Sequence, residues 1–299
     1  LLSPITFSIL VESVSGAHIL TDKILAFIRL IRPLNGLITG LSVCVGALTV
    51  GVFPPDLIVL IAGTSASLVA AAGYAFNDVV DLDIDRLNRP ERPLPAGRIS
   101  PKTAALGAQF LALAGLFIAW WLNPILGLFA SVVAGSLFLY SRYLKMKPLW
   151  GNLLVALLAA SAFPYGALAV GSWGRSWIPA LFAFLFHLGR EIVKDLEDLE
   201  GDRRNGAQTL PIRWGAAPAG AFATSVFLVL AVIVLLPWLS GLYGWHFLLC
   251  VLLVNVLTGI ALLQMWSARF DLRDAKVSRL LTAGMFLGLA AIAVGELLS

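Results

Sequence analysis

Long apolar stretches separated by short polar ones dominate the chain. Glycine, proline and asparagine interrupt one set of connections, which are short and nearly uncharged, whereas the other set is charged, at 79–101, 144–150, 196–214 and 268–277. A helix of about 20 apolar residues crosses a bilayer. The pattern predicts an all-α polytopic membrane protein, one domain over 1–299, with nine transmembrane helices in one bundle at 34–52, 57–78, 102–121, 124–143, 151–171, 177–195, 215–236, 245–267 and 278–298.

Basic residues lie almost entirely on one side of this predicted bundle. The chain is 59% hydrophobic and 13% charged, and of its 21 lysines and arginines only Arg175 falls on the side of the uncharged connections. The positive-inside rule therefore predicts a multi-pass protein of the cell membrane with its N-terminus and charged loops in the cytoplasm and its C-terminus outside. This bias accounts for the pI of 9.3, so nothing indicates nucleic acid, and no obligate protein partner is evident.

The first 22 residues differ from the rest. Residues 1–22 lack the basic start of a secretory signal. We expect them to form a peripheral or poorly ordered N-terminal segment.

Acidic residues gather on the basic side in a pattern that membrane topology does not require. Most of the 17 acidic residues lie within 78–91 and 191–202. The first stretch contains DVVDLDID (78–85) and the second DLEDLEGD (195–202), so both read D-x-x-D-x-x-x-D. Each motif follows the second helix of a group of four. This predicts a weak four-helix internal duplication, with the two motifs facing each other in the bundle.

Helical spacing brings the polar residues of each motif to one face. Offsets of three, four and seven residues return to nearly the same side of a helix. The residues on these faces are Asn77, Asp78, Asp81 and Asp85 in the first motif and Asp195, Asp198 and Asp202 in the second. Carboxylates this close repel each other unless a cation intervenes. Oxygen ligands suit Mg²⁺, which fills its remaining coordination positions with water and substrate phosphates. The motifs therefore predict a Mg²⁺ site that holds a diphosphate.

Two other interpretations stay open from the residues alone. Either motif by itself fits a solvated acidic helix end balanced by nearby arginines, although the same spacing twice on one membrane face favours a shared site. A cation transporter is a further alternative, with the acids forming an ion path. Transporter sites usually lie near the bilayer midplane at broken helices, whereas these acids lie at helix ends.

The two long motifs resemble those of a known family. The stretches NDVVDLDIDRLNRPERPLPAGRIS (77–100) and REIVKDLEDLEGDRRNGAQTLPI (190–212) are similar to the first and second motifs of the UbiA superfamily of intramembrane prenyltransferases. The shorter RPLNGL (32–37) and YSRYLK (140–145) stand in the expected order. The resemblance covers most of the chain. Within the family, the amino-acid sequences of these two motifs are most similar to those of archaeal enzymes that join a geranylgeranyl group to geranylgeranylglyceryl phosphate.

The resemblance implies a role for each matching residue. The expected Mg²⁺ ligands are Asn77, Asp78, Asp81, Asp85, Asp195, Asp198 and Asp202, and the expected catalytic residues among them are Asp81, Asp85, Asp198 and Asp202. The expected contacts to the diphosphate are Arg32, Arg92, Tyr140, Lys145 and Lys194. Asn35 is expected to touch a substrate, and Asp83 faces away from the stripe and is not expected to be a ligand.

The activity that the resemblance implies is a Mg²⁺-dependent transfer between two lipids. An isoprenyl group, geranylgeranyl in particular, moves from its diphosphate to the hydroxyl of geranylgeranylglyceryl phosphate, a step in archaeal ether-lipid synthesis. Both apolar tails stay among the helices of the bilayer while the charged heads meet at the cytoplasmic face. The alternative acceptor is aromatic, such as 4-hydroxybenzoate or another quinone precursor, because family members share the diphosphate machinery and differ mainly in the acceptor pocket.

Overall fold

The computed structural model describes residues 21–145, 147–204, 206–270, 272 and 277–298. The predicted peripheral segment lies outside these residues except for its last two positions. Throughout the described residues the regular structure is helical and no strand occurs, which confirms the predicted all-α class.

The helices follow the predicted apolar stretches closely. The first part of the chain contains a helical segment at Thr21–Ile31, then α2 (Pro33–Leu48), α3 (Leu57–Val80), α4 (Leu82–Asn88), α5 (Pro101–Leu122), α6 (Pro124–Leu139) and the π-helical η1 (Tyr140–Leu144). The second part contains α7 (Trp150–Ala160), α8 (Ala162–Ala169), α9 (Trp177–Glu197), α10 (Leu199–Arg204), α11 (Leu210–Trp214), α12 (Ala216–Ile233), α13 (Leu236–Leu239), α14 (Trp245–Ser267) and α15 (Val277–Leu297).

Polar caps set where several helices begin. The carboxylate of Asp56 accepts a hydrogen bond from the Val59 N–H at the start of α3, and Ser100 does the same for Thr103 at the start of α5. Asn123 caps α6 through the Ile125 N–H. Each cap satisfies a backbone donor that has no partner within the first helical turn.

Seven of the described helices or helix pairs are long and apolar enough to cross a membrane. An eighth is present if Thr21–Ile31 and α2, which are bent by 45° at Arg32, form one span. A helix lies at every predicted position, but α9 is not counted among these spans because its last turns carry the charged residues Arg190, Glu191 and Lys194. The chain is therefore a multi-pass membrane protein, while the predicted count of nine spans is not confirmed.

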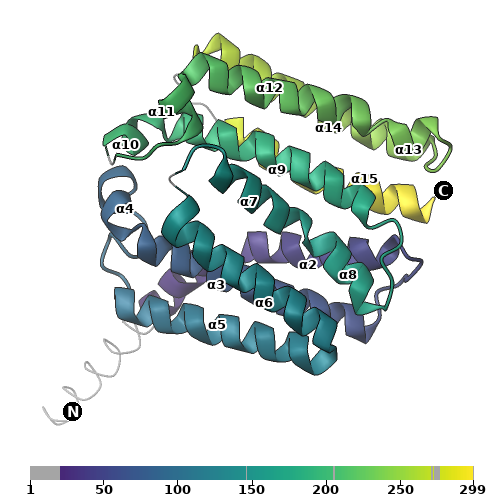
Figure 1. The fold of residues 1–299 in the computed structure, drawn as a ribbon, viewed down its shortest axis with the longest axis horizontal. Helices are drawn as coiled ribbons and strands as arrows, with labels where there is room; N and C mark the ends of the chain where they lie inside the picture. Colours follow the sequence, from purple (N-terminus) through teal and green to yellow (C-terminus); the bar gives the residue numbers. More distant parts are fainter. Residues whose placement is uncertain (1–20, 146, 205, 271, 273–276, 299) are drawn as a thin grey trace, which may run out of the picture.

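The long helices run side by side, with α3 packed on α2 and α5, α2 on α8, α9 on α7 and α12, and α14 on α15 (Figure 1). Small residues lie where helices cross, as Ala156, Ala219 and Ala261 are fully buried in one core cluster. Small side chains let membrane helices approach closely.

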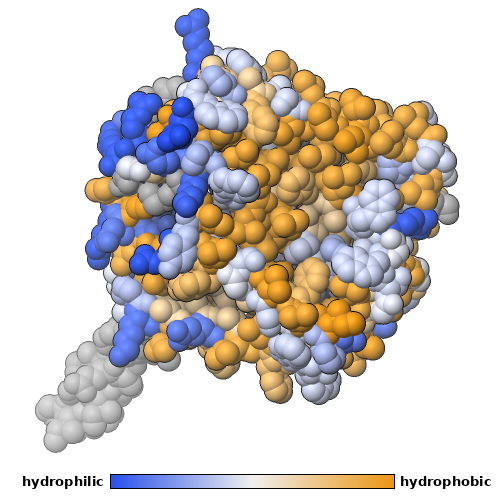
Figure 2. All heavy atoms as spheres, in the orientation of Figure 1, coloured by the Kyte–Doolittle hydropathy of each residue, from blue (hydrophilic) through white to orange (hydrophobic). Residues whose placement is uncertain are grey.

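Large apolar side chains face outward around the middle of the bundle. On α5 the residues Phe110, Leu113, Phe117 and Trp121 form an exposed stripe at helical spacing, each at least 67% exposed. Figure 2 shows a hydrophobic band across the middle and a hydrophilic end over the side where α4, α10 and α11 lie. A bilayer covers such a band, and the hydrophilic end then stands at its surface.

Candidate active site

Each acidic motif crosses a junction between a long helix and a short one. Asp81 (φ −85°, ψ 2°) joins α3 to α4, and Asp198 (φ −92°, ψ 3°) joins α9 to α10. Backbone hydrogen bonds continue through both junctions, since Asp81 N–H donates to Asn77 and Asp198 N–H donates to Lys194. The middle aspartates thus share one local conformation. Because α4 and α10 pack against each other, the two motifs meet at one end of the bundle.

A cavity of about 460 Å³ opens between the motifs and continues among the helices. Its charged end is formed by residues of α3, α4, η1, α9 and α10. Its inner part is apolar, with walls that include Phe182, Phe227, Leu230, Phe247 and Ile292. A pocket with an apolar body and a few convergent polar groups suits a lipid that carries a charged head.

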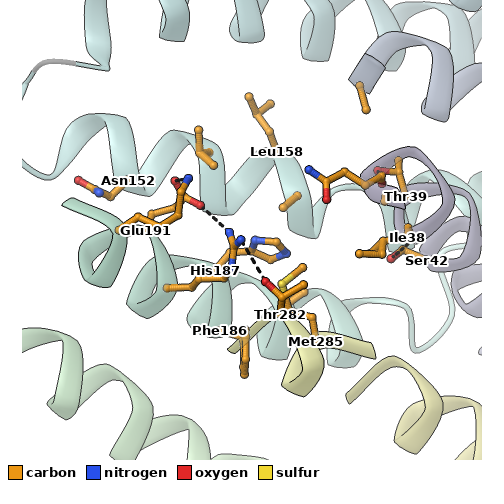
Figure 3. Close-up of a pocket in the computed structure, with 18 of the residues that line it drawn as sticks. Ile38, Thr39, Ser42, Asn152, Leu158, Phe186, His187, Glu191, Thr282 and Met285 are labelled. Carbon is orange, nitrogen blue, oxygen red and sulfur yellow. Dashed lines mark hydrogen bonds and ion pairs between the residues drawn. The ribbon is translucent and has the colours of Figure 1, made fainter. Parts of the chain in front are cut away.

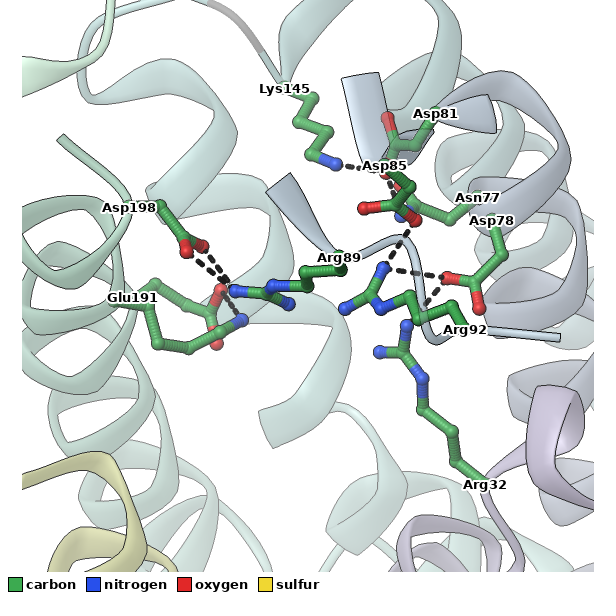
Figure 4. Close-up of polar contacts among 11 residues, drawn as sticks. Arg32, Asn77, Asp78, Asp81, Asp85, Arg89, Arg92, Lys145, Glu191 and Asp198 are labelled. Carbon is green, nitrogen blue, oxygen red and sulfur yellow. Dashed lines mark hydrogen bonds and ion pairs between the residues drawn. The ribbon is translucent and has the colours of Figure 1, made fainter. Parts of the chain in front are cut away.

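The first motif is buried and surrounded by cations. Asp81 and Asp85 are 4% and 6% exposed. The Nζ of Lys145 pairs with Asp81, and Nη1 of Arg92 lies 2.5 Å from Oδ2 of Asp85 (Figure 4). Asn77 Nδ2 donates to Asp81 Oδ2 at 2.6 Å. Buried carboxylates are stable only when paired in this way or bound to metal.

Asp78 belongs to the same motif but has a different environment. Its Oδ1 accepts from Arg32 Nη2 at 2.6 Å and lies 3.6 Å from Arg92 Nη1. It is absent from the lining of the cavity, which it approaches only through these arginines. The guanidinium of Arg32 also stacks 5.1 Å from the ring centroid of Tyr74.

The second motif is less enclosed and has one strong contact to the first half of the chain. Arg89 Nη2 lies 2.5 Å from Oδ1 and 2.8 Å from Oδ2 of Asp198, so it joins α4 to the end of α9 (Figure 4). Asn152 Nδ2 donates to Asp195 at 2.8 Å. Burial, and then the neighbouring charge of Asp198, raise the pKa of Asp202 to about 6.

The donor set fits a hard divalent cation. Oδ1 of Asn77 is buried and has no hydrogen-bond partner among the described residues, an acceptor that a metal would satisfy. Within the described part of the chain, no three acidic, histidine or cysteine side chains converge as a ready metal cluster. Mg²⁺ typically needs only one or two protein carboxylates with water and phosphate oxygens, so the facing motifs meet its requirement.

The structure brings together nearly all of the predicted site residues. The cavity is lined by Arg32, Asn35, Asn77, Asp81, Asp85, Arg92, Tyr140, Lys145, Lys194, Asp195, Asp198 and Asp202. Asp78 is the exception, and its role as a metal ligand stays a prediction, as do the roles of the others. Asp83 lies outside the cavity as expected, with its side chain 90% exposed.

Several lining residues were not among the predicted site residues. Arg89, Asn152, His187, Arg190 and Glu191 all line the cavity. Arg89 was visible in the basic stretch after the first motif, but its spacing gave no sign that it reaches the other half of the bundle. His187, Arg190 and Glu191 stand at helical spacing from Lys194 on α9, a signal that points to one shared face.

The fold and the site together define an intramembrane enzyme for a lipid with a negatively charged head. A family model described as the UbiA prenyltransferase family matches residues 37–292. A digeranylgeranylglyceryl phosphate synthase of Methanopyrus kandleri is 39% identical over 272 residues, covering 89% of this chain and 97% of that protein. One from Methanothermobacter thermautotrophicus is 34% identical and covers 90% and 95%.

Solved structures show the same fold. A structure described as giving insights into digeranylgeranylglyceryl phosphate synthase in membranes has a TM-score of 0.73 at 30% identity, covering 93% of this chain and 100% of that one. A UbiA homologue from Archaeoglobus fulgidus, bound to GPP and Mg²⁺, has a TM-score of 0.67 at 21% identity and covers 90% and 100%. At that lower identity the likeness concerns the fold alone.

The chain belongs to the UbiA prenyltransferase family. It is a membrane-embedded prenyltransferase, which sets aside the interpretation of the acidic motifs as the ion path of a transporter.

Proposed function

We propose that the chain catalyses the Mg²⁺-dependent transfer of a geranylgeranyl group from its diphosphate to the free hydroxyl of geranylgeranylglyceryl phosphate. The observation that carries this proposal is the meeting of two aspartate motifs at the mouth of one apolar cavity. The curated relatives named digeranylgeranylglyceryl phosphate synthase, at 34% to 39% identity over most of the chain, support the choice of acceptor.

The site residues divide into those that hold metal and those that hold phosphate. Mg²⁺ would be held by Asn77, Asp81, Asp85, Asp198 and Asp202, and when bound it neutralises charge on the diphosphate. Arg32, Arg92, Tyr140, Lys145 and Lys194 line the same end of the cavity and would donate to the phosphate oxygens. These contacts stabilise the leaving group as its charge develops.

The reaction itself needs little more than this arrangement. The bond between C1 of the prenyl chain and the diphosphate oxygen breaks, and its electron pair leaves with the diphosphate. The acceptor oxygen bonds to C1 and releases its proton, giving an ether, diphosphate and one proton. The apolar walls, Phe182 and Phe227 among them, exclude water that would otherwise capture the allylic cation.

The same proposal sets an orientation in the membrane. We propose nine crossings, with the N-terminus and the acidic motifs in the cytoplasm and the C-terminus outside, supported by the charge bias of the connections. We also propose that the matching junctions at Asp81 and Asp198 descend from a four-helix duplication. The two lipid tails then enter from the bilayer while the heads meet at its inner surface.

Competition between acceptors tests this function. Purified protein is incubated with labelled geranylgeranyl diphosphate, Mg²⁺ and either geranylgeranylglyceryl phosphate or 4-hydroxybenzoate. We expect an ether-linked lipid phosphate product that disappears with EDTA. If product forms with the aromatic acid but not with the lipid phosphate, the lipid acceptor is contradicted and a quinone precursor is favoured. If neither acceptor leads to release of diphosphate, prenyl transfer itself is contradicted.

A further inference from the structure

A second polar cluster lies in the cavity, beginning beside the second acidic motif and extending deeper into the bundle. It comprises Arg190, Glu191 and Lys194 on α9 and Thr282 on α15. Arg190 is eight residues before Asp198, which places it about 12 Å further along the helix. Figure 3 shows Glu191, His187 and Thr282 together on the wall of the pocket.

Arg190 shares its carboxylate partner with a second cation. The cations Arg32, Arg89, Arg92 and Lys145 each pair with an aspartate of the two motifs. Arg190 and Lys194 instead share the single carboxylate of Glu191, at 3.0 Å and 2.8 Å. Because Glu191 is shared with Lys194, it balances the charge of Arg190 only in part, and the guanidinium can attract a further anion.

Arg190 also has an unfilled hydrogen bond. Its Nη1 donates to Glu191 and its Nη2 to Thr282 Oγ1 at 3.4 Å, a long contact. Its Nε is buried and has no partner among the described residues. A buried arginine N–H without an acceptor is uncommon in proteins and costs free energy until a ligand supplies one.

The proposed reaction brings two anions into one cavity. The diphosphate of the donor would occupy the motif end, where the aspartate-paired cations lie and where the motifs would hold Mg²⁺. The phosphate of the acceptor stands a few bonds from the attacking hydroxyl, so it must lie near the diphosphate without sharing its ligands, because like charges repel. It therefore needs cations of its own.

We infer that Arg190, with Thr282 beside it, binds the phosphate of the lipid acceptor and thereby selects a phosphorylated acceptor over an uncharged one. This inference rests on the proposed function, since it concerns the second substrate of the same site. A guanidinium suits the task because it stays charged and offers several donors to phosphate oxygens. Thr282 helps to hold the guanidinium in place, because its hydroxyl oxygen accepts from Nη2 of Arg190 while its hydrogen is donated to the carbonyl oxygen of Ser278. The subsite therefore joins α9 to α15.

The test compares two acceptors that differ only in the phosphate. Initial rates are measured with geranylgeranylglyceryl phosphate and with geranylgeranylglycerol, and the ratio of their kcat/KM values is the readout. We expect Arg190→Gln to lower the preference for the phosphorylated acceptor at least about tenfold, the loss typical of a charged hydrogen bond. Arg190→Lys should restore part of it, and Thr282→Val should lower it about threefold. The KM for the donor should stay within about twofold.

A matched control separates a local effect from a general change of charge. Arg213 is an exposed arginine of α11 outside the cavity, and Arg213→Gln should leave the ratio unchanged. If Arg190→Gln fails to fold, the ratio of the kcat/KM values for the two acceptors is measured in Arg190→Lys and Thr282→Val instead, and a lowered ratio in these variants supports the inference.

The outcomes separate this inference from the function on which it rests. An unchanged preference in Arg190→Gln, or an equal fall with both acceptors, would overturn the inference and leave the enzyme a lipid-phosphate prenyltransferase. Wild-type protein that makes no product from the phosphorylated acceptor would overturn the proposed function, and the phosphate subsite with it.

Discussion

The aspartates of the first motif lie close in sequence but have different surroundings. Asp81 and Asp85 line the cavity, Asp78 is held by two arginines behind it, and Asp83 points into solvent. Asn77 stands one turn before Asp81 and contributes the one buried carbonyl oxygen of the motif that has no partner in the described structure. The chemistry of the site therefore depends on which face of the helix each residue occupies.

Removal of the Asn77 carbonyl oxygen should weaken metal binding. We expect Asn77→Ala to raise the Mg²⁺ concentration for half-maximal activity about 10- to 100-fold, because a ligand oxygen and the hydrogen bond to Asp81 are both lost. A Mg²⁺ titration of the transfer rate measures this. Asp83→Asn, which removes a charge from the exposed side of α4, is the control and should titrate like the wild type.

An equal Mg²⁺ requirement in the Asn77→Ala and Asp83→Asn variants would contradict the assignment of Asn77 as a ligand.

The acids of the site could be predicted from sequence, whereas most of their partners could not. Repeated spacing identified the two motifs, since a helix turns by a constant angle per residue. Spacing cannot show that Arg89, on the first half of the chain, reaches Asp198 on the second. Residue spacing also cannot show that Arg190 faces the cavity and not the lipid. The end of α9 is amphipathic, and the helices packed around α9 determine which of its sides is enclosed.

At the scale of the helices, a close crossing of α2 and α8 supports the cavity. A Cβ at Gly46 would lie 2.0 Å from the carbonyl oxygen of Phe163, and one at Gly166 would lie 1.9 Å from that of Val43. The two backbones are therefore in direct contact. Both helices contribute cavity residues, so a change in their separation alters the site.

A methyl group at this crossing should destabilise the protein. We expect Gly166→Ala to lower the free energy of unfolding by about 1–3 kcal/mol or more, because backbone must move to admit the side chain. Unfolding of the purified variant in mixed micelles measures the difference. Gly135→Ala on α6, where a Cβ meets nothing within 4 Å, is the matched control and should be neutral or slightly stabilising.

A Gly166→Ala protein as stable as the Gly135→Ala protein would show that the α2–α8 crossing is less tight than described.

Helix positions could be predicted from the apolar pattern, but the junctions within the motifs could not. The predicted stripes assumed one continuous helix, whereas α3 ends at Val80 and α9 at Glu197. Hydrogen bonds run through Asp81 and Asp198 at these junctions, and the predicted acids line the cavity with the exception of Asp78.

At the scale of the whole molecule, the basic residues are distributed unequally between the two ends of the bundle. Arg175, in one of the nearly uncharged connections, pairs with Glu296 at 2.8 Å, and Tyr243 donates to the same carboxylate at 2.5 Å. This small network joins the segment before α9 to the segment before α14 and to the end of α15. The pattern of the sequence assigns the other lysines and arginines to the charged connections or to the segment before α2.

The proposed orientation predicts which loops are accessible from outside the cell. In a background with Cys44→Ala and Cys250→Ala, we expect Ser240→Cys to react with a membrane-impermeant maleimide in intact cells. Glu91→Cys, in the exposed stretch after the first motif, should react only after permeabilisation. The opposite labelling pattern would invert the topology and place the active site outside.

The central claim is that both acidic motifs serve one Mg²⁺-dependent diphosphate site. Its most direct test is the release of diphosphate from geranylgeranyl diphosphate in the presence of acceptor, measured for Asp81→Asn, Asp198→Asn and the control Glu200→Gln, whose exposed carboxylate lies outside the cavity. We predict that either aspartate substitution lowers the rate at least about a hundredfold and that Glu200→Gln keeps most of it. Full activity in either aspartate variant, or in wild-type protein with EDTA, would contradict the shared site.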